Sequence, residues 1–268
     1  MEASVEPYIR AGAALAVFVA LALWEVLAPR RALAVGRGRR WPGNLGIVVL
    51  DTVLVRVLIP VAAVGAAAYA AQRGWGLLNI TPWPFWLDAV AGFVVLDLAI
   101  YAQHVAFHKV PWLWRLHRMH HADLDIDVTT GLRFHPIEIL LSMLIKMVVV
   151  VLVGVPAVAV VVFEVVLNAT SMFNHANAAM PPWLDRVVRL LVVTPDMHRV
   201  HHSVLRHETD SNFGFNLPWW DRLFRTYRVA PEAGHDGMTV GLPVFRDPKE
   251  LRLDRLLSQP FRDDRPGT

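Results

Sequence analysis

Long apolar runs separated by short polar segments dominate this 268-residue sequence. A helix of about 20 mostly apolar residues spans the hydrocarbon core of a bilayer. The last run would be roughly 50 Å long as one helix and exceeds a single crossing. Gly154 and Pro156 near its middle therefore predict a hairpin of two shorter helices. The sequence thus predicts an all-α, polytopic membrane bundle of four to five transmembrane or half-spanning helices. The runs cover residues 11–28, 45–71, 87–102 and 137–169.

The composition agrees with a membrane protein. Hydrophobic residues make up 55% of the chain and charged residues only 18%, against roughly 45–50% and 25% in soluble domains. Asp51, Arg56 and Pro60 interrupt the second run. The Trp-rich stretch 72–86 is typical of a loop at the membrane interface. The absence of cysteine excludes disulfides, iron–sulfur clusters and thiol nucleophiles.

A cluster of arginines from Arg30 to Arg40 follows the first apolar run. A secretory signal peptide would carry its basic residues before the run, so a transmembrane helix is favoured. Basic loops stay on the cytoplasmic side, which also places residues 103–135 and the chain from 173 onward there. We interpret the net charge of +3 as this orientation signal and not as a sign of nucleic-acid binding. We therefore expect an integral protein of the cell inner membrane.

Eleven of the twelve histidines lie between His104 and His207. On a helix, residues at i, i+3 and i+4 share one face, so each cluster would direct two or three imidazoles at one point. Imidazole binds zinc, copper, iron and nickel well. Eight histidines are too many for one ion and indicate two metal ions. The three clusters are His104/His108, His117/His120/His121 and His198/His201/His202.

The pattern His-x-x-x-His, His-x-x-His-His, His-x-x-His-His resembles the fatty acid hydroxylase/sterol desaturase superfamily of membrane di-iron oxidases, with its bacterial-type sterol desaturase proteins. The likeness extends from Asp97 to Val229 and includes residues 129–136 (TTGLRFHP), 212–214 (NFG) and 220–227 (WDRLFRTY). Arg225 departs from it, since relatives often carry glycine there. The resemblance also implies an isolated ligand, which His175 fits.

The resemblance implies an oxidoreductase in which two iron ions and O₂ hydroxylate or desaturate a C–H bond of a lipid. Sterol-like, fatty-acyl, alkylglycerol and carotenoid substrates all remain open. Electrons would come from a separate donor, a cytochrome b5-like protein or a ferredoxin with its reductase. The chain then divides into membrane helices with a basic loop (1–86), a di-iron catalytic domain forming a cytoplasmic histidine-rich helical cap (87–230) and a C-terminal cytoplasmic tail (231–268). The implied iron ligands are His104, His108, His117, His120, His121, His175, His198, His201 and His202.

Ligand histidines usually donate their second ring N–H to a carboxylate or carbonyl. Asp97, His135 and Asp196 are the candidates for such orienting contacts, and His135 is alternatively a tenth ligand. Lys146 and Glu164 are expected to pair across the hairpin. Two other classes of protein stay open at this point. A metal-binding or transport protein would hold its ligands near the bilayer midplane, and a haem-b electron carrier would need single histidines deep in facing helices.

Overall fold

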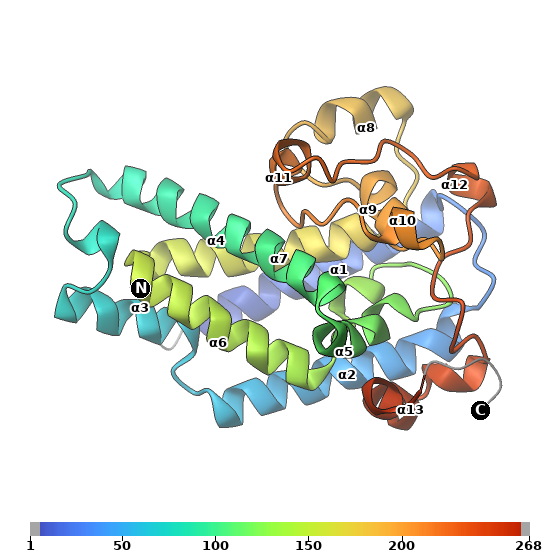
Figure 1. Ribbon diagram of the computed structural model, residues 1–268, viewed down its shortest axis with the longest axis horizontal. Coiled ribbons are helices and arrows are strands. Elements are labelled where there is room, and N and C mark those ends of the chain that lie inside the picture. Colours follow the sequence, from blue (N-terminus) through green and yellow to red (C-terminus); the bar gives the residue numbers. More distant parts are fainter. Residues whose placement is uncertain (1–5, 264–268) are drawn as a thin grey trace.

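The computed structural model describes residues 6–263, and its architecture is helical throughout that range (Figure 1). Five stretches of the described chain are long and apolar enough to cross a membrane. The predicted all-α membrane bundle is therefore confirmed. The long helices are α1 (Glu6–Leu27), α2 (Arg37–Leu58), α3 (Ala62–Arg73), α4 (Phe85–Lys109), α6 (Pro136–Val153) and α7 (Ala157–His175).

A proline and a glycine mark the ends of helices α2 and α6. Helix α2 stops at Leu58, just before Pro60, because proline lacks an N–H and clashes with the preceding turn. The other two interruptions of this run, Asp51 and Arg56, lie inside α2 and do not break it. Gly154 ends α6 with φ of 79°, a left-handed conformation that favours glycine, so the predicted hairpin α6–α7 is confirmed.

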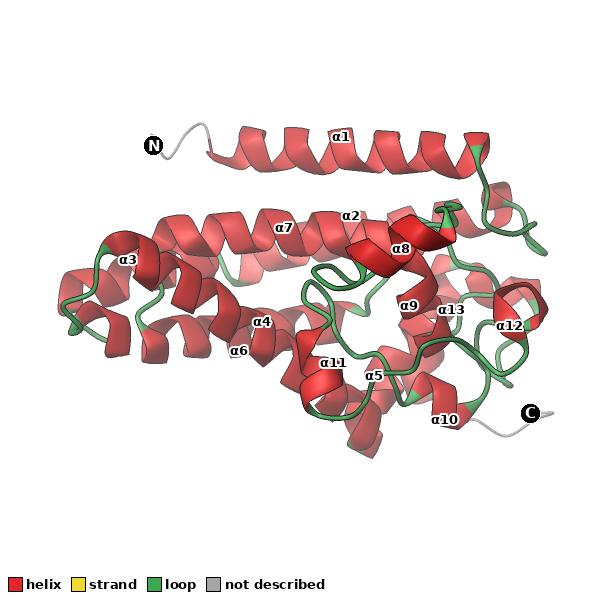
Figure 2. Ribbon diagram, turned by 90° about the horizontal axis from the view of Figure 1, so that it is seen from above, coloured by secondary structure: helices red, strands yellow, loops and turns green. Residues whose placement is uncertain are grey.

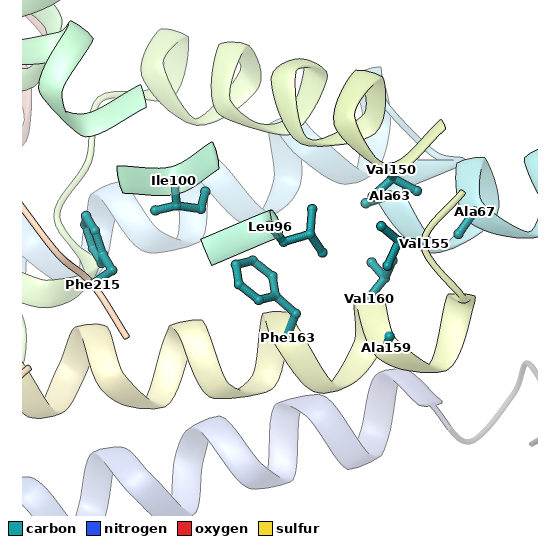
Figure 3. Packing of buried hydrophobic residues seen from close by; sticks show 10 residues of the cluster. All are labelled: Ala63, Ala67, Leu96, Ile100, Val150, Val155, Ala159, Val160, Phe163 and Phe215. Carbon is teal, nitrogen blue, oxygen red and sulfur yellow. The ribbon is translucent and has the colours of Figure 1, made fainter. Parts of the chain in front are cut away.

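The long helices pack side by side around a shared apolar core. Helix α1 lies along α7, α3 contacts α6 and α7, and α4 lies between α6 and α7 (Figures 1 and 2). Leu96 of α4 and Phe163 of α7 are central to this core (Figure 3). Lipid tails are as apolar as these side chains, so close packing and not exclusion of water favours the contacts.

Short helices and loops gather at the end of the bundle where α4 and α7 finish (Figures 1 and 2). The basic loop between α1 and α2 lies at this same end, and the loop between α3 and α4, with exposed Trp75 and Trp83, lies at the opposite end. The short helices are α5 (Pro111–His121), α8 (Pro182–Val188), α9 (Pro195–His201), α10 (Arg206–Thr209), α11 (Trp219–Leu223), α12 (Gly234–Gly237) and α13 (Leu253–Ser258), with 3-10 turns η2 (Thr130–Leu132), η3 (Pro248–Leu251) and η4 (Gln259–Phe261). A further 3-10 turn, η1 (Leu77–Asn79), belongs to the loop between α3 and α4.

The described part of the expected C-terminal tail, residues 231–263, packs into this cap and is not a loose extension. Arg115 of α5 donates from Nε to the carbonyl of Pro260 at 2.7 Å. The carbonyl of Leu251 approaches Gly43 of α2 so closely that a Cβ there would lie 2.1 Å from it. The last five residues of the expected tail, and residues 1–5, lie outside the described range.

Candidate metal centre

The fold brings the nine histidines of the implied ligand set together in one buried place at the cap end of the bundle. Their side chains form two groups, and each member offers a ring nitrogen within 4.8 Å of the others in its group. None of the nine residues is more than 3% exposed. We call His104, His108, His117, His121 and His201 the five-histidine group, and His120, His175, His198 and His202 the four-histidine group.

Each His-x-x-His-His motif is divided between the two groups. His117 and His121 enter the five-histidine group, whereas His120 joins the four-histidine group. In the last motif the pair His198 and His202 stays together and His201 crosses over. A helix turns 100° per residue, so residues at i and i+4 point 40° apart while i+3 and i+4 diverge by 100°. The helical spacing therefore directs two imidazoles of a motif to one group and the third to the other.

The spacing of the ring nitrogens suits bound metal ions. Two nitrogens at right angles around an ion, each about 2.1 Å from it, lie about 3 Å apart. In the structure several Nε2 pairs are separated by 3.1 Å, and Nε2 of His201 has no hydrogen-bond partner among the described residues. The pairs are His104–His117, His108–His121, His120–His175, His175–His198 and His175–His202.

Contacts at Nδ1 fix the orientation of five rings. Carbonyl and carboxylate oxygens only accept, so each of these Nδ1 atoms carries the proton and leaves the Nε2 lone pair for a metal. Four of the partners are backbone carbonyls and one is the Glu138 side chain. The contacts run from His104 to Phe213 O (2.7 Å), His117 to Glu138 Oε1 (2.7 Å), His120 to Arg133 O (3.0 Å), His175 to Ser171 O (2.6 Å) and His201 to Ser211 O (2.7 Å).

Four imidazoles of the two groups are held in their neutral form by their surroundings. Burial lowers the pKa of His120, His121, His198 and His202 well below the ordinary value, and repulsion between neighbouring rings lowers it further. A neutral imidazole is the form that binds a metal. The convergent, deprotonated nitrogens thus fit a metal cofactor of the borderline transition-metal type.

The three candidates for orienting contacts make none with these nine histidines. Asp97 accepts from Trp220 Nε1 at 2.8 Å, and Asp196 pairs with Arg199. His135 caps α6 by accepting from the Ile137 N–H, and its Nε2 lies 3.2 Å from the Leu257 carbonyl. These assignments differ from the structure because sequence proximity to a cluster does not fix the direction of a side chain.

Glu138 was missed by the sequence reasoning, although it is the carboxylate that contacts His117. It lies in the first turn of α6, two residues after Pro136. An acidic residue at that position is ordinarily explained by the helix dipole, so the sequence carried no separate signal. His207 is half exposed and pairs with Glu232 at 2.6 Å, away from both groups.

A buried ion network holds the loop that follows the second histidine motif. Arg40, at the start of α2, donates to Asp123 at 2.8 Å and to Asp127 at 2.5 Å. Burial alone would raise the pKa of Asp123, but the guanidiniums of Arg40 and Arg133 hold it well below its usual range. The arginines of the basic loop therefore contribute to the architecture of the site as well as to its charge.

A cavity of about 290 Å³ extends from the five-histidine group into the bundle between α2, α4, α6 and α7. His104 and His117 form part of its wall at the cap end. Lys146 and Glu164 lie in its wall on the hairpin arms, and their ion pair of 2.6 Å confirms the predicted contact. The remaining wall is largely apolar, with Ile100, Phe107, Leu132, Phe134, Met143, Leu167 and Phe215.

Comparison with known proteins agrees with this geometry. The sequence is 31% identical over 150 residues to ornithine lipid hydroxylase OlsE of Rhizobium tropici, a match covering 56% of this chain and 44% of that protein. It is 25% identical over 193 residues to human alkylglycerol monooxygenase (69% and 40%) and 26% identical over 141 residues to rat cholesterol 25-hydroxylase (52% and 46%). The matches thus span less than half the length of these relatives. No solved structure matches the chain significantly.

The family model described as fatty acid hydroxylase matches residues 89–226, which contain all nine histidines of the two groups. This match covers just over half of the chain. The protein belongs to the fatty acid hydroxylase family.

Proposed function

We propose that this protein is a membrane-bound di-iron oxygenase that hydroxylates a C–H bond of a lipid. The observation that carries the proposal is the pair of buried histidine groups, of which His104 and His117 line a largely apolar cavity. Hydroxylation is favoured over desaturation because the relatives are named as hydroxylases and monooxygenases. The substrates in their names are ornithine lipid, alkylglycerol and cholesterol. All three are lipids, but they have no headgroup in common.

The two groups would hold one iron each, through Nε2 atoms that the contacts at Nδ1 orient. Iron bound there would supply the reductive activation of O₂ that oxidation of an unactivated C–H bond needs. The chain's own part is to hold the rings fixed, to exclude water by burial, and to bring the target carbon beside His104 and His117. Insertion of one oxygen atom consumes O₂, two electrons and two protons and releases water.

The electrons are proposed to come from a separate protein, a cytochrome b5-like donor or a ferredoxin with its reductase. Two side chains of the cap, Trp114 and Arg206, support the approach of such a donor protein to its outer face. Trp114 is half-buried, and its ring centroid lies 4.9 Å from that of His108 and 5.4 Å from that of His121. Arg206 lies over the same indole at 4.8 Å, which adds positive charge to this face. A donor with an acidic surface would be attracted there.

We place the protein in the cell inner membrane with the metal centre on the cytoplasmic side. The basic loop between α1 and α2 supports this orientation, because it lies at the same end of the bundle as the histidines. Ligands at the ends of α4 and α7, outside the middle of the spans, also favour an enzyme over a metal transporter.

The experiment combines metal analysis with lipidomics. Cells that express the wild-type chain or His120→Ala are compared by mass spectrometry, and the purified proteins are assayed for iron. We expect two iron ions per wild-type chain and a lipid heavier by one oxygen atom that the variant fails to produce. One ion per wild-type chain, or the same oxidised lipid from both cells, would refute the proposal.

A further inference from the structure

A carboxylate without a partner lines the cavity. Asp51 of α2 is 8% exposed, contributes to the cavity wall and makes no hydrogen bond or ion pair with any described residue. An ionisable side chain in a membrane-spanning helix is costly and is normally paired. A buried polar atom without a partner therefore calls for an explanation, such as a ligand that is bound in the working protein.

Two further residues that line the same cavity each have a buried oxygen without a partner. Glu138 uses Oε1 to accept from His117, which leaves its Oε2 unpaired. Gln103 donates from Nε2 to Ser142 Oγ at 2.7 Å, and its Oε1 has no partner. Asp51, Glu138 and Gln103 come from three different helices and line one space.

Two other polar side chains of the cavity wall are already engaged. Thr52 donates to the carbonyl of Val48 at 2.8 Å, and Lys146 pairs with Glu164. The cavity thus offers hydrogen-bond acceptors in an apolar wall, which an entirely hydrocarbon ligand would leave unsatisfied at a cost in free energy.

We propose that Asp51, with Glu138 beside it, binds a hydrogen-bond-donating group of the substrate, a hydroxyl or an amine, inside the cavity. The substrate class is then a lipid that carries such a donor within the buried segment, and not a plain hydrocarbon chain. This inference rests on the proposed function of the cavity as the lipid site. Asp88 provides the contrast, because its carboxylate lies in the first turn of α4, where the helix dipole stabilises it, and it does not line the cavity.

The test compares two isomeric probes, 1-decanol and methyl nonyl ether, which contain the same atoms but differ in the hydroxyl donor. Iron-loaded protein in nanodiscs is titrated with each probe, and bound probe is counted by native mass spectrometry. The ratio of the two apparent dissociation constants is then compared between wild type, Asp51→Leu and Asp51→Asn. Because all proteins are in the same nanodiscs, the different partitioning of the probes cancels. Asp88→Leu is the matched control.

We expect the preference for 1-decanol to fall about tenfold in Asp51→Leu, which corresponds to about 1.4 kcal/mol. Asp51→Asn keeps one acceptor oxygen, so its preference should be intermediate, and Asp88→Leu should equal wild type. Iron content should stay unchanged in all three variants. If both probes bind and the ratio is the same in wild type and the Asp51 variants, this inference is overturned and the lipid cavity stands. If neither probe binds the wild-type protein, the inference and the cavity's role as the lipid site are both overturned.

Discussion

Replacing Glu138 should weaken metal binding by the five-histidine group selectively. Its Oε1 accepts from Nδ1 of His117 at 2.7 Å, and the residue is only 3% exposed, so water cannot take over the lost contact. Removal of such an outer contact typically weakens metal binding about 10–100-fold, equivalent to about 1.4–2.7 kcal/mol. Glu138→Gln keeps a neutral acceptor and should show the smaller loss, because charge-assisted hydrogen bonds are roughly twice as strong as neutral ones. Glu138→Ala should show the larger loss.

The assay is dialysis of iron-loaded protein against a graded series of chelator concentrations, followed by measurement of iron per chain. One of the two ions should leave at a 10–100-fold lower chelator concentration in the variants, and the other should leave at the wild-type concentration. Asp51→Asn is the control, because this carboxylate lines the same cavity but contacts no histidine. Release curves that match wild type in both Glu138 variants, or equal weakening of both ions, would refute the reasoning.

Three further outcomes follow from the contacts around the site. Arg40→Met removes a guanidinium that two buried carboxylates share and should cost about 3–5 kcal/mol of stability, seen as a lower midpoint of thermal unfolding; an unchanged midpoint contradicts this. His120→Ala should lose one of two iron ions while the half-exposed His207→Ala keeps both, and equal iron contents would disagree. Gly131→Ala would place a Cβ 2.2 Å from the Ser171 carbonyl, so it should cost about 1–3 kcal/mol and loosen iron in the four-histidine group; wild-type iron release would argue against it.

Much of the fold was predictable because its signals are local. Apolar runs of sufficient length predict membrane helices whatever surrounds them, and Pro60 and Gly154 end helices through their own backbone chemistry. The pairing of Lys146 with Glu164 was also predictable, since the hairpin turn between them fixes which arms face each other. The packing of the described part of the C-terminal segment was not predictable. Its contacts with α2 and α5 join residues that are distant in sequence, and such contacts leave no local pattern.

The candidate site was predictable in its residues but not in its connections. The i, i+3, i+4 spacing selected the histidines, yet the orienting partners are mostly backbone carbonyls, which have no residue type for a sequence to show. Asp97 was chosen as an ionisable residue on the helical face of His104, and Asp196 for its position beside a cluster. The structure directs them to Trp220 and Arg199 instead.

The sequence by itself determined which segments enter the membrane and which imidazoles share a helical face, because both depend on the chemistry and spacing of neighbouring residues. Only the tertiary structure decided which histidines of separate motifs meet in each group, and that Glu138 and Asp51 line one cavity. The physical reason is that a ring's direction around its own helix follows from local geometry, whereas the groups it meets depend on how separate helices pack.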